Sequence, residues 1–176
     1  DVLEAALRPL GFEVDRFIAG EAPDWPVENL FATRDGMGTG RHFAFAGHLD
    51  VVPPGPGWTS DPFVPEVRGD LLYGRGAVDM KSSIAAFVAA IPAEHAGRIS
   101  LIITGDEEGP AAHGTVELIE YMRARGLVPD LCLVGEPTSA NRLGDMMKIG
   151  RRGSVNIWIT VPGVQGHVGY PHLADN

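Results

Sequence analysis

The stretch FAFAGHLD, residues 43–50, decides the fold class. Phe43 to Gly47 is an apolar run without polar alternation, which is typical of a strand buried on both faces of an α/β sheet. His48 and Asp50 follow at once, so we expect them at the carboxyl end of that strand. Ligands bind beyond the carboxyl ends of the strands in open α/β sheets.

Two further apolar runs have the same design. RISLIIT, residues 98–104, is followed by GDEEG at 105–109, and LCLV, residues 131–134, is followed by GEPT at 135–138. Each run is short and apolar enough to be a buried strand, and acidic side chains come directly after it. Three strand ends with polar residues predict one shared site.

Helical spacing of apolar residues predicts helices over 80–90 and 116–125, between these strands. Alternation of strand and helix implies parallel strands with helices packed on the sheet. Upstream, the pattern predicts a helix over 1–10 and strands over 12–17 and 29–33. We therefore expect an α/β fold whose mostly parallel sheet carries helices on both faces.

Two regions depart from this pattern. Residues 52–70 contain too many prolines for regular structure, and a loop of that length in a compact domain is usually functional. From Lys148 the sequence alternates apolar and polar residues with period two, which predicts an antiparallel ribbon. We expect residues 1–150 to be the first part of one domain and residues 151–176 to be the first strands of an inserted second domain.

Composition excludes several classes of protein. The 176 residues hold 14 Lys and Arg against 23 Asp and Glu, a net charge of −9, and no basic patch for nucleic acid. No apolar run approaches the roughly 20 residues of a membrane span, so the cytoplasm is the simplest location. Cys132, the one cysteine, excludes an internal disulfide and is expected to be buried in its strand. Any metal must therefore be held by His, Asp and Glu.

Six His, Asp and Glu side chains are expected just after strands or at the start of a helix. They are His48, Asp50, Asp79, Glu107, Glu108 and Glu136. A single Asp or Glu after a strand is commonly a helix cap or a solvated loop charge. Several carboxylates brought together, however, repel one another unless a cation neutralises them. Zinc accepts both His nitrogen and carboxylate oxygen, so the set favours a dinuclear hydrolase site.

Four motifs in one order, HLDVVP, GRGAVDMK, TGDEEG and GEPT, resemble the aminoacylase and carboxypeptidase G superfamily of dinuclear zinc metallopeptidases. The likeness extends from Phe43 to Asn176. It implies a zinc-peptidase-like catalytic domain, interrupted by an α/β lid domain that also forms a homodimer. It also implies a longer protein, because no residue here matches the family's last zinc-ligand histidine.

The resemblance also implies roles for the motif residues. Zinc, for which cobalt can substitute, would be held in two positions: His48 and Glu136 on the first ion, Glu108 on the second, and Asp79 bridging both. Glu107 would be the general base that activates a water. Asp50 would orient the His48 ring, and a cis peptide bond would follow Asp79.

The resemblance also gives roles to residues after Lys148. His167 would reach the active site of the partner subunit and stabilise the oxyanion. Arg151, Ser154 and Tyr170 would hold the carboxylates of the substrate. For His167 an ordinary loop histidine, and for Arg151 a solvated strand charge, remain alternatives. The other four histidines match no motif and are expected at the surface: His42, His95, His113 and His172.

Within the superfamily, LGDMMKIGRRGS and GVQGHVGYPHLADN are most similar to members that hydrolyse N-succinyl-LL-2,6-diaminoheptanedioate in diaminopimelate and lysine biosynthesis. The small-molecule substrate is thus expected to be an acylated amino acid. Acetylornithine deacetylase, a glutamate carboxypeptidase, or a catalytically incomplete metal-binding fragment are the alternatives. A serine hydrolase is excluded because no G-x-S-x-G elbow occurs. Alone, the chain is expected to hold at most one zinc ion tightly and to be inactive.

Overall fold

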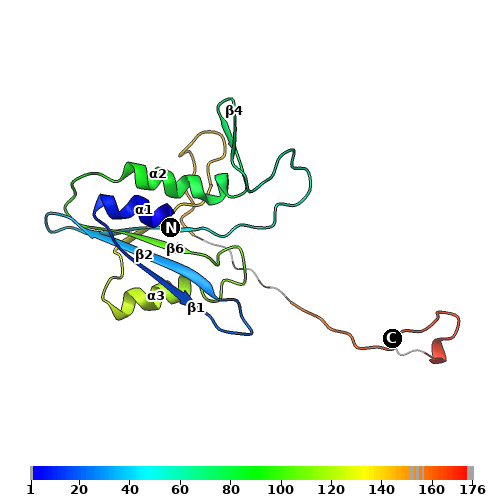
Figure 1. Ribbon diagram of the computed structural model, residues 1–176. Helices are drawn as coiled ribbons and strands as arrows, with labels where there is room; N and C mark the ends of the chain where they lie inside the picture. Colours follow the sequence, from blue (N-terminus) through cyan, green and yellow to red (C-terminus); the bar gives the residue numbers. More distant parts are fainter. Residues whose placement is uncertain (1, 151–152, 154, 156, 174–176) are drawn as a thin grey trace. The chain divides into compact units, whose positions relative to one another are not determined.

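The computed structural model describes residues 2–150, 153, 155 and 157–173 (Figure 1). The chain divides into two compact units, 1–137 and 138–176. The domain boundary expected at residue 150 stays a prediction. Among the described helices, none is long and apolar enough to cross a membrane.

The first unit is built on a five-stranded mixed sheet with the strand order β1-β2-β6-β3-β7. The strands are β1 Glu13–Ala19, β2 Val27–Asp35, β3 His42–His48, β6 Arg98–Thr104 and β7 Leu131–Val134. The strand pairs β3–β6 and β3–β7 are parallel. The pairs β1–β2 and β2–β6 are antiparallel. The expectation of a mostly parallel sheet is therefore wrong for the β1–β2 half.

Connection lengths explain the mixed sheet. Residues 20–26 are all that separate β1 from β2, and so short a link permits only an antiparallel hairpin. β3, β6 and β7 are instead joined through helices, as parallel strands require. The parallel half was predicted because its strands alternate with helices along the sequence. The pairing of β2 with β6, which places Phe31 opposite Ile102, joins segments far apart in sequence.

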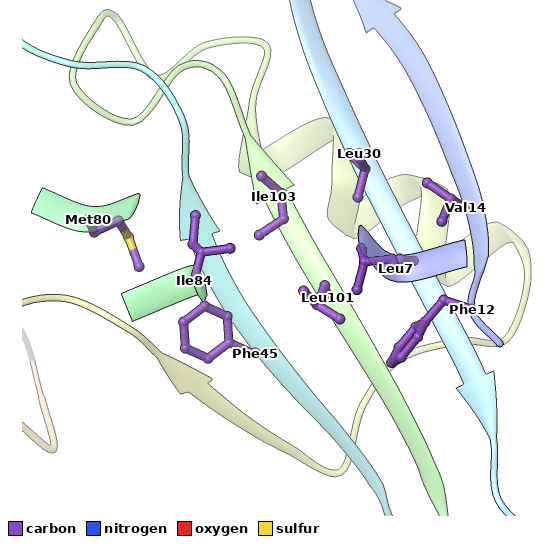
Figure 2. Packing of buried hydrophobic residues seen from close by; sticks show 10 residues of the cluster. Leu7, Phe12, Val14, Leu30, Phe45, Met80, Ile84, Leu101 and Ile103 are labelled. Carbon is purple, nitrogen blue, oxygen red and sulfur yellow. The ribbon is translucent and has the colours of Figure 1, made fainter. Parts of the chain in front are cut away.

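Helices cover both faces of the sheet, as predicted (Figure 1). On one face, Leu7 of α1 (Val2–Leu7) and Ile84 of α2 (Ser82–Ala90) pack with Phe45 and Leu101 (Figure 2). On the other face, α3 (Thr115–Ala124) packs through two buried residues. These are Leu118 and Met122, in contact with Phe31, Ala44 and Ile102. Neighbouring residues of β3 thus enter opposite cores, as a strand buried on both faces requires.

The proline-rich segment contains more order than its sequence predicts. β4 (Glu66–Arg68) and β5 (Leu71–Tyr73) form a two-stranded antiparallel sheet at the end of this loop. Gly69, in the left-handed region with φ of 60°, begins the tight turn between them. The expectation of no regular structure is therefore wrong for the last residues of the segment, where the turn residues of a two-residue hairpin went unrecognised.

The second unit contains little regular structure. Described residues 153, 155 and 157–163 belong to no strand, although alternation predicted a ribbon there. Its regular features, among the described residues, are an isolated bridge at Val164 and the short 3-10 helix η3 (Pro171–Leu173). Another short 3-10 helix, η1 (Arg8–Leu10), lies elsewhere in the chain. Period-two alternation indicates a strand only where a neighbouring strand pairs with it.

Two expectations about single residues are also wrong. His42 is buried, not superficial, and its Nε2 lies 2.7 Å from the hydroxyl of Ser100. Cys132 is exposed, not buried. Both errors have one cause: the sequence does not show that His42 faces the inner strand β6, or that β7 is an edge strand.

Candidate metal centre

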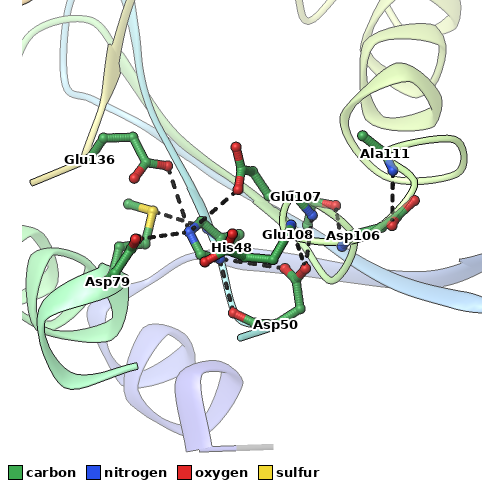
Figure 3. Close-up of polar contacts among 10 residues, drawn as sticks. His48, Asp50, Asp79, Asp106, Glu107, Glu108, Ala111 and Glu136 are labelled. Carbon is green, nitrogen blue, oxygen red and sulfur yellow. Dashed lines mark hydrogen bonds and ion pairs between the residues drawn. The ribbon is translucent and has the colours of Figure 1, made fainter. Parts of the chain in front are cut away.

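The carboxyl ends of three adjacent parallel strands bring the expected site residues together. His48 is the last residue of β3, Glu107 and Glu108 follow β6, and Glu136 follows β7 (Figure 3). The backbone N–H of Leu49 donates to the carbonyl of Thr104 at 2.9 Å, so β3 and β6 stay paired up to the site. The site therefore lies where the apolar runs and their polar ends predicted it.

His48 is the centre of the cluster. Its side chain is 1% exposed. Nε2 lies 3.2 Å from Asp79 Oδ1, 3.6 Å from Glu136 Oε1 and 3.9 Å from Glu107 Oε2. Nδ1 lies 3.0 Å from the backbone carbonyl of Asp50. A carbonyl only accepts, so Nδ1 carries a proton, and Nε2 is the ring nitrogen that faces the carboxylates.

This donor set fits a cation. A nitrogen lone pair that faces carboxylates repels them, and either a proton or a metal ion between the groups removes the repulsion. Burial lowers the pKa of His48, but the Asp50 carbonyl and the Glu136 carboxylate more than offset it, and the net pKa is raised. Burial and the Asp79 carboxylate raise the pKa of Glu136. The His48 shift and the Asp79 contribution to the Glu136 shift are consistent with a surplus of negative charge around one nitrogen.

Two sets of three ligand atoms lie close enough to share an ion. The first set is His48, Asp79 and Glu108, and the second is His48, Glu107 and Glu136; within each, the atoms lie within 4.8 Å of one another. Oxygen and imidazole ligands at such spacing suit divalent metal ions. The geometry does not separate Glu107 from Glu108 as base and ligand, because each joins one set.

Asp79 reaches the site from η2 (Ala77–Lys81), directly before α2. Asp79 and Met80 have non-helical dihedral angles, and the peptide bond between them is cis, as the resemblance implied. The Met80 side chain is fully buried, and its sulfur accepts the backbone N–H of His48 at 3.3 Å. The Met80 packing thus ties the Asp79 segment to the end of β3.

A glycine precedes Glu136 for a steric reason. A Cβ added to Gly135 would lie 2.2 Å from Phe45 Cζ and 2.8 Å from Met80 Cε. The backbone N–H of Gly135 donates to the carbonyl of Ala46 at 3.0 Å. Glycine therefore lets β7 continue close to β3 and deliver Glu136 beside His48.

Asp106 is a structural residue that the sequence interpretation missed. Its side chain is buried, and its carboxylate accepts the backbone N–H groups of Ala111, Ala112 and His113 at 2.8 to 3.1 Å. These bonds fold residues 106–113 into the loop that carries Glu107 and Glu108. Its place as the first carboxylate after β6, ahead of the two glutamates, was the available signal.

The residues expected after Lys148 lie in the second unit or outside the described residues. Arg151 and Ser154 lie outside them. His167 and Tyr170 are exposed, and their rings lie 5.6 Å apart. Nδ1 of His167 accepts the backbone N–H of Gly169 at 3.0 Å. Their roles stay predictions.

A family comparison agrees with the motifs. The model of peptidase family M20/M25/M40 matches residues 44–171. The chain belongs to this family. The likeness seen in the four motifs is thereby confirmed, and the M20/M25/M40 match spans the whole set of candidate ligands from His48 to Glu136.

Relatives of the chain carry a more specific name. Succinyl-diaminopimelate desuccinylases of Sphingopyxis alaskensis and Rhizorhabdus wittichii are 74% and 73% identical to it, over 100% and 99% of the chain. The alignments cover 47% and 46% of those proteins. The chain thus spans about half the length of the curated relatives it matches.

Two solved structures have a similar fold. Human carnosine dipeptidase 1 superposes with a TM-score of 0.64 at 29% identity, over 76% of this chain and 31% of that one. The dipeptidase Dug1p of Saccharomyces cerevisiae gives 0.56 at 17% identity, over 70% and 28%. The second likeness concerns the fold alone. The mixed sheet with helices on both faces is therefore an M20-type arrangement.

Proposed function

We propose that the complete protein containing this chain hydrolyses the succinyl amide of N-succinyl-LL-2,6-diaminoheptanedioate to succinate and LL-diaminopimelate. The observation that supports the assignment as a hydrolase is the buried His48 nitrogen with three carboxylates within 4 Å. The choice of succinyl is supported by the relatives 74% and 73% identical to the chain, which are succinyl-diaminopimelate desuccinylases.

In this proposal the donor set holds zinc. His48, Asp79 and Glu136 would hold one ion, and Glu108 a second that shares Asp79. Cobalt could occupy the same ligands. When bound, such ions would polarise the scissile carbonyl and make a water more acidic. A His48 ring with a free Nε2 lone pair is the form that can bind, and the Nδ1 bond to the Asp50 carbonyl keeps the ring oriented so that Nε2 is the nitrogen facing the ion.

Glu107 would move the protons. Its carboxylate is 47% exposed, so a substrate and a water can reach it. The carboxylate would accept a proton from the attacking water as the water oxygen bonds to the amide carbon. It would then pass that proton to the nitrogen as the C–N bond breaks, which releases the amine. His167 of a partner subunit in a homodimer would stabilise the oxyanion between these steps.

Substrate recognition would involve Arg151, Ser154 and Tyr170. A fixed guanidinium suits the distal carboxylate of a succinyl group, which an acetyl group lacks. We expect the metal-loaded complete protein to prefer N-succinyl-diaminopimelate over N-acetylornithine in kcat/KM. An equal or reversed preference would assign the protein to a sister deacylase of the same family.

A further inference from the structure

The side chain of Asp50 contacts the loop after β6 more closely than it contacts His48. Oδ2 accepts the backbone N–H of Glu107 at 3.0 Å and that of Glu108 at 2.8 Å (Figure 3). Oδ1 is buried without a hydrogen-bond partner and lies 3.5 Å from Nδ1 of His48. That nitrogen instead donates its hydrogen bond to the Asp50 backbone carbonyl, at 3.0 Å.

The two halves of Asp50 therefore have separable tasks. Any residue at position 50 can offer its carbonyl to His48, so the ring tautomer does not require a carboxylate there. The bonds through Oδ2 do require a side-chain acceptor. Two consecutive amides bound to one oxygen fix the peptide plane between Glu107 and Glu108, and bonds to an ionised acceptor are among the stronger ones.

We propose that the Asp50 carboxylate is a positioning residue for the Glu107–Glu108 pair. It holds their backbone against the end of β3, so the two glutamates lie close to His48 before any cation binds. The inference rests on the proposed function only in taking these glutamates as metal ligand and base. Asp106 accepts hydrogen bonds from the far end of the same loop, at residues 111–113, whereas Asp50 accepts those of Glu107 and Glu108.

Amide hydrogen exchange of the metal-free chain, followed residue by residue by NMR, tests the contact directly. In Asp50→Ala the amides of Glu107 and Glu108 should exchange at least about tenfold faster, while those of Ala111, Ala112 and His113 keep their protection. Asp50→Asn keeps an oxygen that can accept both bonds, so its protection should stay close to wild type. Asp61→Ala is the matched control, because Asp61 accepts the backbone N–H of Phe63 in an exposed loop.

Cobalt titration of the same variants tests whether the contact preassembles the site. Asp50→Ala should weaken Co²⁺ binding about 10- to 100-fold. Asp50→Asn should lose much less Co²⁺ affinity, and Asp61→Ala should keep the wild-type affinity. Unchanged exchange at Glu107 and Glu108 in Asp50→Ala would overturn the proposal. So would equal losses of Co²⁺ affinity in the Asn and Ala variants, because Asp50 would then act by charge alone. A wild-type chain that binds no Co²⁺ would contradict the proposed function, while the exchange result still decides the positioning role.

Discussion

At the scale of single residues, the surroundings of a side chain decide what it can do. His42 begins and His48 ends the same strand, and both are buried. His48 faces carboxylates, and its net pKa is raised. His42 faces the Ser100 hydroxyl, and burial, followed by the Arg98 guanidinium, lowers its pKa. His48 is therefore suited to binding a cation, and His42 to a core position in which its ring is neutral.

The adjacent glutamates give the first prediction. Glu107→Gln in the metal-loaded complete protein should lower kcat at least about 100-fold while metal content stays near wild type, because an amide cannot accept the proton. Glu108→Gln should instead lose metal, because it removes a ligand oxygen from the His48 and Asp79 set. Elemental analysis beside steady-state kinetics separates the two. Metal loss in Glu107→Gln alone would reverse the assignment.

His42 gives a prediction about pH. Its folded-state pKa is lowered, so the neutral ring contributes stability that is complete above the ordinary value of 6.5 and is lost as pH falls below it. The Val128 carbonyl and the Asp130 and Asp35 carboxylates oppose the shift without cancelling it.

The free energy of unfolding, measured by urea denaturation, should therefore fall more steeply between about pH 7 and pH 5 in the wild type than in His42→Gln. His172→Gln, at an exposed position in η3, should keep the wild-type slope. Equal slopes in wild type and His42→Gln would show that His42 does not carry this acid sensitivity.

At the scale of elements, the apolar runs predicted where these strands lie in the sequence but not which strands are neighbours in the sheet. The predicted spans of β6 and β7 agree with the structure, because a short apolar run bounded by turn residues is a local signal. Exposure of Cys132 on β7 could not be read from LCLV, because edge position depends on strand order. The clustering of the candidate site residues was predictable because the carboxyl ends of parallel strands lie at the same edge of a sheet. The contacts of Asp50 and Asp106 were not, because they depend on loop conformation.

The close approach of β7 to β3 gives a prediction at this scale. Gly135→Ala should destabilise the chain by about 1–3 kcal/mol, because the new Cβ would overlap Phe45 and Met80 in a packed core. The displaced β7 end should also weaken Co²⁺ binding through Glu136. Gly38→Ala is the control, since its Cβ would come no closer than 3.9 Å to any atom. Urea unfolding that gives equal stabilities for the two variants would contradict the steric argument.

At the scale of the whole molecule, one unit carries every described candidate ligand. His48, Asp79, the two glutamates and Glu136 all lie within residues 1–137. The residues expected to bind the substrate lie in the second unit or outside the described residues. Metal binding by the first unit can therefore be measured without turnover.

The central claim is that His48 and the carboxylates at the ends of β3, β6 and β7 form a divalent metal centre. Zinc content of the purified chain after dialysis, in wild type and His48→Ala, tests it most directly. In the proposed assignment His48, Asp79 and Glu136 would supply three ligands, the number that catalytic zinc sites use, so we expect one retained zinc ion per chain in the wild type and none in His48→Ala. Zinc retained by His48→Ala, or none in the wild type, would contradict the claim.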